Sequence, residues 1–374
     1  MTRFVSIALM LCALAACGRR GGQSDATQTA GDTITTEARL LTLVEHDGWT
    51  LAELRNPWDE HAAPARYALV GADDVIPTLP EGVTAVRVPL RKSVVTSSVH
   101  MAAIDELGAA GSIAGVTDAA YVTTPSVKAG LASGVIADAG TSSSPTLETI
   151  LDIAPDAVLA TPYAGSDHSA LTKMKITVME MADYMEQTPA GRAEWIRLIG
   201  RLYGRASEAD SLYDVSMAEY RRLASLGASV AERPVVITEQ LTSGTWYVPG
   251  GASYMARLLA DAGADYPFAS DTSAGSLALD FATVFDRAGE ADYWLLKTYG
   301  ADITLDGLKA DYPLNARMKA WRTGKVYAAD TAVCGLFEEF PFHPERLLAD
   351  YLLIFHPELA GQLPAARYFH RVKP

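Results

Sequence analysis

A chain of 374 residues exceeds what one hydrophobic core usually supports, so two lobes are expected. Hydrophobic residues make up 49% of the chain and charged residues 20%, which is ordinary for a globular protein. The formal net charge of −14 argues against binding to nucleic acid and against electrostatic adhesion to an anionic bilayer.

The N-terminus has the features of an export signal. Arg3 is followed by the apolar run 4–14, which is too short to span a bilayer, and small residues precede Cys17. The sequence Leu-Ala-Ala-Cys-Gly resembles the bacterial lipoprotein signal, which implies a signal peptide at 1–16 and lipid attachment to Cys17. An ordinary secretory signal with an incidental cysteine is the alternative. Residues 17–32 are polar and rich in Gly, Ser, Thr and Gln, which predicts a flexible tether.

Residues 33–92 predict a small β-rich segment. Alternating apolar residues on both sides of Asp47-Gly48 are the strongest short signal for a hairpin. The predicted strands are 39–46, 49–55, 65–70 and 83–88. The pattern indicates no role for this segment.

Residues 93–187 alternate strands with helices, which predicts a mostly parallel sheet in a first α/β lobe. The predicted strands are one that ends at Val95, then 113–116, 157–160 and 177–181. The predicted helices are 100–107, 145–153 and 170–174.

Residues 188–227 predict helices that link two lobes. Thr188-Pro189 is a good helix start, and apolar residues then repeat at helical spacing. Gly204 and the capping pattern that begins at Ser207 indicate a break. The second helix would have about 20 residues and span ~30 Å, enough to cross from one lobe to the other.

Residues 228–374 repeat the order of the first lobe. The predicted strands are 234–238, 293–296 and 326–328, and the predicted helices are 253–262, 280–287, 304–309, 315–321 and 344–355. Trp246-Tyr247, Lys297 and Tyr299 are predicted in loops. Residues 151–154 match 285–288 just before a strand in each half, an offset of 134 residues. The predicted fold class is therefore α/β, with two Rossmann-like lobes joined by a long α-helix and an N-terminal β-rich extension.

Several short motifs occur in an order typical of a known family. They are Val94-Val95-x-Ser97-Ser98, Gly115-Val116-Thr117, Leu147-Glu148-x-Ile150, Pro155–Leu159, Trp246–Gly251 and Phe340–Tyr351. From Ser93 to about residue 359, the chain resembles the helical-backbone (class III) substrate-binding proteins of ABC transporters. The resemblance implies a monomeric periplasmic lipoprotein without enzymatic activity. It would capture a ferric siderophore, haem or cobalamin between two lobes and deliver this chelate to an inner-membrane permease.

The candidate ligand-binding residues come from loops expected at the carboxyl ends of the strands, because open α/β sheets bind ligands there. They are Ser97, Ser98, His100, Tyr121 and Tyr163 in the first lobe, and Trp246, Tyr247, Lys297, Tyr299, Phe337 and Glu338 in the second. Aromatic rings with polar tips suit a large, flat or metal-chelated ligand. Tyr121, Tyr163, Tyr247 and His100 could ligate haem iron, Lys297 could pair with an anionic siderophore, and cobalamin needs mainly aromatic walls.

The resemblance also implies that a glutamate on each lobe docks on the permease. Glu148 matches the position in the first lobe. The offset of 134 residues carries that position to Ala282, so the second glutamate is missing. Asp280 or Asp286 could replace it.

Three other functions remain open. A protein for bare metal ions would need converging His, Asp, Glu or Cys groups, but the seven histidines form no cluster in the sequence. Cleavage before Cys17 would leave only one other cysteine, Cys334, which is expected to be a buried free thiol. An enzyme resembling the bilobal chelatases is possible, although none of the common catalytic motifs occurs. A surface lipoprotein that only docks partner proteins is the third.

Overall fold

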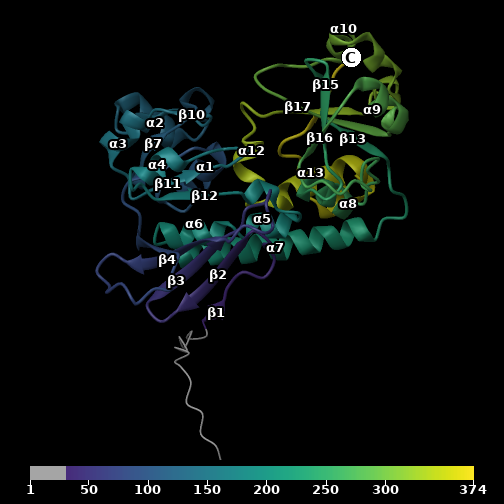
Figure 1. Ribbon diagram of the computed structural model, residues 1–374. Helices are drawn as coiled ribbons and strands as arrows, with labels where there is room; N and C mark the ends of the chain where they lie inside the picture. The colour runs from purple at the N-terminus through teal and green to yellow at the C-terminus, as the bar shows by residue number, and fades with distance from the viewer. Residues whose placement is uncertain (1–30) are drawn as a thin grey trace, which may run out of the picture. The chain divides into compact units, whose positions relative to one another are not determined.

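The computed structural model describes residues 31–374 (Figure 1). The predicted signal peptide, the lipidation site at Cys17 and nearly all of the tether lie outside the described residues. Among residues 31–374, no helix is both long enough and apolar enough to cross a bilayer.

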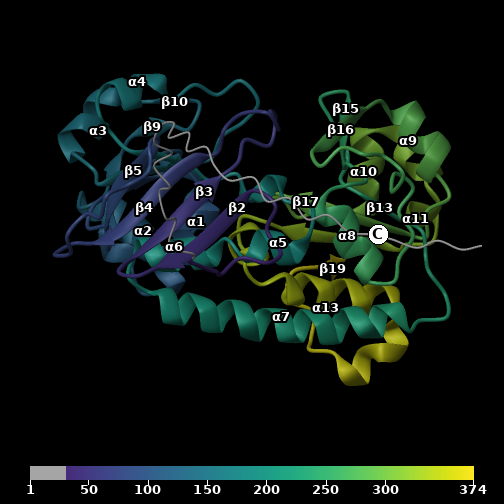
Figure 2. The same ribbon diagram turned by 60° about the horizontal axis from the view of Figure 1, so that its bottom comes forward.

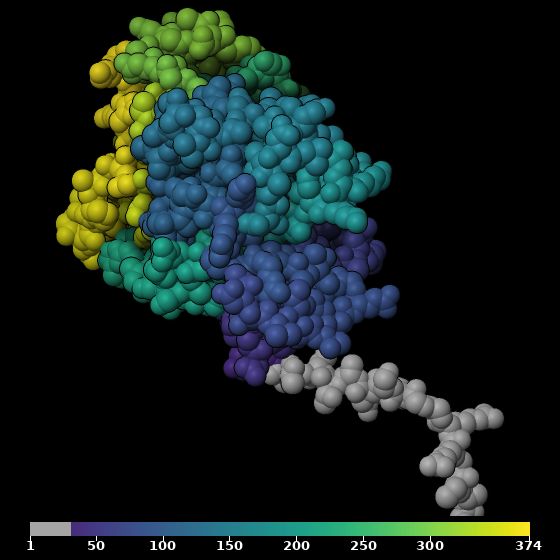
Figure 3. Space-filling view, turned by 90° about the vertical axis from the view of Figure 1, so that its left-hand side faces the viewer, coloured from purple at the N-terminus to yellow at the C-terminus, as the bar shows by residue number. Residues whose placement is uncertain are grey.

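The four predicted N-terminal strands and a short strand before them, β1, form one five-stranded sheet in the order β1-β2-β3-β4-β5. Neighbouring strands are antiparallel except for β4 and β5, which are parallel. The bounds are β1 Asp32–Thr33, β2 Leu41–His46, β3 Trp49–Leu54, β4 Ala65–Gly71 and β5 Val83–Val88. In Figure 3 this sheet, purple to blue, lies against the first lobe. Tyr67 makes one of the contacts, because its hydroxyl donates to the Val178 carbonyl at 2.6 Å.

Two buried carboxylates anchor the segment that leads into this sheet. Glu194 accepts hydrogen bonds from the backbone N–H groups of residues 36–38, and Glu186 accepts them from residues 39 and 40. A buried carboxylate is costly unless it is hydrogen-bonded, and so is a buried N–H group. Here the carboxylates and the N–H groups satisfy each other. The extension is thereby fixed to the linker region.

The first lobe has a parallel sheet in the order β12-β11-β6-β7-β8. Its strands are β6 Ser93–Val95, β7 Ile113–Val116, β8 Ala137–Asp138, β11 Ala157–Ala160 and β12 Val178–Glu180. Its helices are α1 Ser98–Glu106, α2 Pro125–Ser133, α3 Leu147–Ile153 and α4 Ser169–Lys173, and a short hairpin comprises β9 Gly140–Thr141 and β10 Ser144–Pro145. All of the predicted elements are confirmed; β8, α2 and the hairpin were not predicted.

The linker consists of α5 Pro189–Ala193, α6 Ile196–Leu202 and α7 Ala206–Ala228. The predicted break at Gly204 is confirmed, and this glycine has the left-handed φ of 66° that L side chains rarely adopt. The predicted cap at Ser207 is wrong, because the helix already begins at Ala206. With 23 residues, α7 spans ~35 Å and runs beneath both lobes (Figure 2).

The second lobe has a sheet in the order β13-β17-β18-β19, in which only β19 is antiparallel. The strands are β13 Val236–Thr238, β17 Tyr293–Thr298, β18 Val326–Asp330 and β19 His370–Arg371. A separate antiparallel sheet comprises β14 Leu241–Thr242, β15 Thr245–Pro249 and β16 Ser276–Leu279. The helices are α8 Tyr254–Asp261, α9 Phe281–Ala288, α10 Leu305–Asp311, α11 Lys319–Arg322, α12 Leu336–Glu339 and α13 Pro344–Phe355. Short 3-10 helices are η1 Ala110–Ser112, η2 Ala119–Tyr121, η3 Asp183–Met185, η4 Pro313–Arg317 and η5 Pro357–Gln362.

Four local predictions in the second lobe are wrong. Trp246 and Tyr247 lie in β15 rather than in a loop, and Lys297 belongs to β17, which continues beyond the predicted end. The helix predicted at 315–321 is divided into η4 and α11. Cys334 is half-buried rather than buried, and it forms no disulfide within the described chain.

The two lobes share one strand order. In the first lobe β12, β11, β6 and β7 are neighbours; in the second, β18, β17 and β13 are neighbours, and a parallel bridge joins Val235 to Asp265 in the position of β7. The predicted offset of 134 residues also holds for two helices, because Thr146 and Asp280 are the N-cap residues of α3 and α9. The structure therefore supports a duplicated α/β lobe.

Candidate functional site

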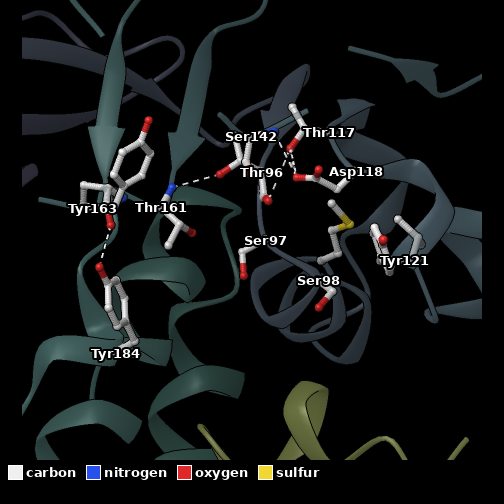
Figure 4. Close-up of a pocket in the computed structure, with 13 residues that line it drawn as sticks. Thr96, Ser97, Ser98, Thr117, Asp118, Tyr121, Ser142, Thr161, Tyr163 and Tyr184 are labelled. Atoms are coloured by element: carbon white, nitrogen blue, oxygen red, sulfur yellow. Dashed lines mark hydrogen bonds between the residues drawn. The ribbon is translucent and has the colours of Figure 1, made fainter. Parts of the chain in front are cut away.

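A cavity of about 380 Å³ lies at the carboxyl ends of β6, β7 and β11 in the first lobe (Figure 4). Its polar lining is mostly hydroxyl groups, from Thr96, Ser97, Ser98, Thr117, Ser142 and Thr161, with the rings of Tyr121, Tyr163 and Tyr184 beside them. Of the predicted ligand-binding residues, the structure brings together Ser97, Ser98, Tyr121 and Tyr163 here.

Three threonines follow the three strands and tie their ends together. The Thr161 N–H donates to Thr96 Oγ1 at 2.9 Å, and Thr117 Oγ1 donates to the Thr96 carbonyl at 3.3 Å. Thr161 Oγ1 is buried and has no hydrogen-bond partner among the described residues. A buried hydroxyl without a partner is costly, so a ligand that bonds to Thr161 would remove that cost.

Asp118 is the carboxylate of this cavity. Its backbone has the left-handed φ of 52°, which is uncommon for a residue other than glycine and costs roughly 1 kcal/mol. Asp118 Oδ2 accepts a hydrogen bond from the Ser142 N–H at 2.9 Å. It also lies 3.3 Å from Thr117 Oγ1, whose single proton it shares with the Thr96 carbonyl. The carboxylate is thus held in place at the cavity wall, with Oδ1 not used in these bonds.

One tyrosine of the cavity is held by a hydrogen bond within the protein, and two are exposed. The Tyr184 hydroxyl donates to the Pro162 carbonyl at 2.7 Å, and burial together with Asp183 raises the pKa of Tyr184 to about 12. Tyr184 is therefore a fixed neutral group. Tyr163 and Tyr121 are 49% and 62% exposed, so their rings are available to a ligand.

The second lobe places different side chains at the equivalent positions. The Thr96 N–H bonds to the Leu159 carbonyl in the first lobe, and the Glu239 N–H bonds to the Leu295 carbonyl in the second. Matching these strand ends pairs Thr96 with Glu239, Thr161 with Lys297, and Tyr163 with Tyr299. Two hydroxyls in the first lobe thus correspond to an acid and a base in the second.

Two stacked tryptophans hold Glu239 in its position. The indole of Trp246 donates to the Thr238 carbonyl at 2.9 Å, and that of Trp294 donates to the Glu239 carbonyl at 2.7 Å. The rings lie 5.5 Å apart, and both are fully buried. Together they support the left-handed φ of 65° at Glu239. The expectation that Trp246 contacts the ligand is corrected: its side chain belongs to the core.

Lys297 is also corrected. It was expected to offer a cation to an anionic ligand, but its ammonium group forms an ion pair with the Glu239 carboxylate. Both side chains are largely buried, so the charge of Lys297 is already compensated within the protein.

Aromatic rings from the two lobes meet at the edge of the cavity. The centroids of Tyr121 and Tyr299 lie 5.8 Å apart with the planes tilted by 60°, a favourable geometry for aromatic pairs. Tyr299 and Tyr247 are 55% and 54% exposed, and Phe337 is 42% exposed. Exposed aromatic rings in the second lobe therefore stay available to a ligand.

Two further predicted residues lie outside this cavity. His100 is 1% exposed, and its Nε2 bonds to Asp183, which also binds Arg192, so a ligand cannot reach it. Glu338 lines a different cavity, of about 480 Å³, and accepts a hydrogen bond from Thr123 Oγ1 at 2.7 Å. This bond joins α12 of the second lobe to the loop before α2 of the first.

Glu148 and the position paired with it by the offset lie on equivalent helices of the two lobes. Glu148 is exposed in the first turn of α3, and Ala282 is exposed at the equivalent position of α9. Asp280, a candidate replacement, caps α9 by accepting a hydrogen bond from the Thr283 N–H, which lowers the pKa of its carboxyl group. Asp286 is exposed on the same helix.

The sequence interpretation missed Thr96, Asp118, Thr161, Tyr184 and Glu239. Thr96, Thr161 and Glu239 come directly after strands, and Asp118 lies two residues after one. The residues that follow each predicted strand could therefore have been chosen as candidates from the sequence. Within residues 31–374, no group of three or more His, Cys, Asp or Glu side chains is placed to hold a metal ion.

Known proteins share this fold. Residues 94–333 match the family described as periplasmic binding protein. An uncharacterised lipoprotein of Methanocaldococcus jannaschii is 26% identical over 315 residues, which cover 79% of this chain and 74% of that protein. A periplasmic haem-binding protein of Pseudomonas aeruginosa superposes with a TM-score of 0.59 at 14% identity, over 76% of this chain and 99% of that one. A protein of an Fe³⁺-hydroxamate transport system of Saccharomonospora viridis superposes with a TM-score of 0.57 at 19% identity, over 72% of this chain and 94% of that one. The chain belongs to the periplasmic binding protein family.

Proposed function

We propose that this protein is the substrate-binding lipoprotein of an ABC importer and that it carries a metal chelate to the membrane permease. The ligand would be a ferric siderophore, haem or cobalamin, and it would bind without chemical turnover. The protein would act as a monomer outside the cytoplasm, tethered to the membrane through a lipid on Cys17.

The observation that carries this proposal is the hydroxyl-lined cavity at the carboxyl ends of β6, β7 and β11, with Tyr299 of the second lobe against Tyr121 at its edge. Aromatic rings supply contact area for a large ligand, and hydroxyls supply donors and acceptors that orient it. The haem-binding and hydroxamate-transport proteins with the same fold agree with a chelate as ligand.

If the ligand is haem, the exposed tyrosines are the candidates for its iron. Tyr121, Tyr163 and Tyr247 have exposed rings, whereas His100 is excluded by its burial and its bond to Asp183. Replacing these tyrosines one at a time with phenylalanine would keep the ring and remove the oxygen ligand.

The test is a titration of the purified protein with haemin, cyanocobalamin and ferric siderophores, followed by absorbance and by intrinsic tryptophan fluorescence. Trp246 and Trp294 lie behind Glu239, so a light-absorbing chelate in the cleft should quench them. We expect saturable binding at micromolar concentration or tighter for one of these chelates. The variant Tyr163→Ala should weaken that binding, and Leu314→Ala, an exposed residue far along the chain from the cavity, should not. If no chelate binds at micromolar concentration, the proposed function is wrong.

A further inference from the structure

The loops at the carboxyl ends of the parallel strands carry acids and no free strong base. Within residues 31–374, the loops that follow β6, β7, β8, β11, β12, β13, β17 and β18 contain neither lysine nor arginine. His168, in the loop after β11, bonds through Nδ1 to Glu180 at 2.8 Å. Lys297, at the end of β17, is paired with Glu239. The walls formed by these loops thus offer a ligand no uncompensated cation, and no lysine or arginine among the described residues lines the first-lobe cavity. Lys128 of α2 lies instead at the other cavity, with Glu338.

Two carboxylates of these walls are fixed where they lie. Asp118 is held by the Ser142 N–H and by Thr117 Oγ1. Glu239 is held by its bond to Lys297, and the backbone of this residue is fixed by the indole of Trp294. Both residues have left-handed backbone conformations, with φ of 52° and 65°. Non-glycine residues in this conformation are concentrated at functional sites, because the surrounding structure has to hold them there.

The rest of the first-lobe wall is neutral and can still bond to a ligand. The buried hydroxyl of Thr161 has no partner among the described residues and lies at the cavity, as Figure 4 shows. An anionic ligand would lose its hydration in the first-lobe cavity and find only hydroxyls and the Asp118 carboxylate among its polar side chains. A neutral chelate can use the hydroxyls and rings alone, and a cationic one is attracted by Asp118, which forms no ion pair with a base. Glu239 contributes by cancelling the charge of Lys297, which would otherwise attract an anionic ligand.

We propose that this cleft selects a metal chelate of zero or positive net charge over anionic chelates, and that Asp118 and Glu239 set this preference. Neutral ferric trihydroxamates, cationic ferrioxamine B and neutral cyanocobalamin belong to the favoured class. Ferric tris-catecholates and haemin, with its carboxylates, belong to the disfavoured class. This inference rests on the proposed function and narrows it.

The experiment compares affinities of the full chain for ferrichrome, ferrioxamine B, cyanocobalamin, haemin and ferric enterobactin by isothermal titration calorimetry at two salt concentrations. We expect the tightest binding from a neutral or cationic chelate, with the two anionic ones roughly tenfold or more weaker. Binding of ferrioxamine B should weaken as salt rises, because salt screens its attraction to the Asp118 carboxylate.

Two variants test whether Glu239 and Asp118 cause the charge preference. Glu239→Gln frees the Lys297 ammonium and should strengthen ferric enterobactin binding roughly tenfold. Asp118→Asn should weaken ferrioxamine B binding more than cyanocobalamin binding, because only the first ligand carries a net positive charge. Glu232→Gln, which removes the same charge from an exposed position, is the matched control and should change neither. Circular dichroism checks that each variant is folded.

The outcomes separate this inference from the proposed function. If an anionic chelate binds tightest, or if Glu239→Gln and Asp118→Asn behave like the control, the charge preference is refuted while the carrier function stands. If none of the five chelates binds, the proposed function fails and this inference fails with it.

Discussion

At the scale of single residues, side chains that looked suited to a ligand divide into two groups. Tyr121, Tyr163 and Tyr299 are exposed at the cavity, whereas Trp246 and His100 are buried and bonded within the protein. The sequence places all of these near strand ends, but it does not say which way a side chain points. That direction depends on strand register and on partners far away in sequence, such as Asp183 for His100.

The group of His100, Asp183 and Arg192 leads to a prediction about stability. Burial opposes the charge of Asp183, but Arg192 and His100 outweigh burial and lower the pKa of this carboxyl group. We expect Asp183→Asn to lower the free energy of unfolding by about 3–5 kcal/mol, because it leaves Arg192 buried without its counter-charge. Urea denaturation followed by circular dichroism would measure this.

The same group fixes the direction of a pH effect. Since the pKa of Asp183 is lower in the folded protein than its ordinary value of 3.8, its contribution is present above that value and is lost as the pH falls below it. Asp311→Asn, at an exposed position of α10, is the control and should change stability by less than about 0.5 kcal/mol. Equal effects of the two variants would contradict a special role for Asp183.

At the scale of elements, most of the fold could be predicted from periodicity. Except for the short β8 and β19, the strands of the two lobes' main sheets and the break at Gly204 were expected, because apolar runs, alternation and glycine act locally. The sheet of β14, β15 and β16 could not be predicted, because β16 pairs with β15 across about 30 residues of chain. Its pairing explains why Trp246 is a core residue.

The anchoring of the N-terminal sheet gives a prediction at this scale. Glu194→Ala would leave the N–H groups of residues 36–38 without their acceptor. We expect a loss of about 2–4 kcal/mol of stability and faster hydrogen exchange confined first to the start of the sheet. Exchange followed by mass spectrometry would measure both. The control Glu232→Ala, at an exposed position, should leave the hydrogen exchange of this segment unchanged. If Glu194→Ala speeds exchange uniformly over all elements, the local anchoring is contradicted.

At the scale of the whole molecule, the duplicated lobes predict how a permease is recognised. Glu148 and Ala282 occupy the same place on α3 and α9, so the two lobes present different charges at equivalent surfaces. We expect Glu148→Arg to impair uptake in cells strongly while the affinity of the purified protein for its chelate stays unchanged, because charged rims act on encounter and specificity. A large loss of chelate affinity would contradict a docking role.

Asp280 and Asp286 are the two acids that could compensate for Ala282. Asp280 already caps α9, so Asp280→Asn, which keeps a cap, should leave uptake intact if this residue is only a cap. Asp286→Arg should impair uptake if Asp286 is the second docking residue. Ala282→Glu should restore the symmetric pair and partly rescue uptake in the Asp286 variant.

The contact between the lobes at α1 and α13 gives the last prediction. His343 Nε2 bonds to Glu106 of the first lobe at 2.9 Å, and His343 Nδ1 bonds to Glu345 at 3.2 Å. Burial and Arg346 oppose protonation of His343, but the two carboxylates outweigh them and raise its pKa to about 9. The charged imidazolium therefore holds the two lobes together at neutral pH.

The sign of the effect follows from the raised pKa. The stabilisation of the folded protein by charged His343 is fully present below the ordinary histidine pKa of 6.5. It is lost as the pH rises through the raised pKa of about 9. Glu106→Gln should remove much of this pH dependence, lower the pKa of His343 and loosen the lobes. NMR titration of the imidazole and unfolding measured from pH 6 to about pH 10 test it, with Glu232→Gln as the control for charge. An unchanged pH profile in Glu106→Gln would show that the bond to Glu106 does not govern the contact between the lobes.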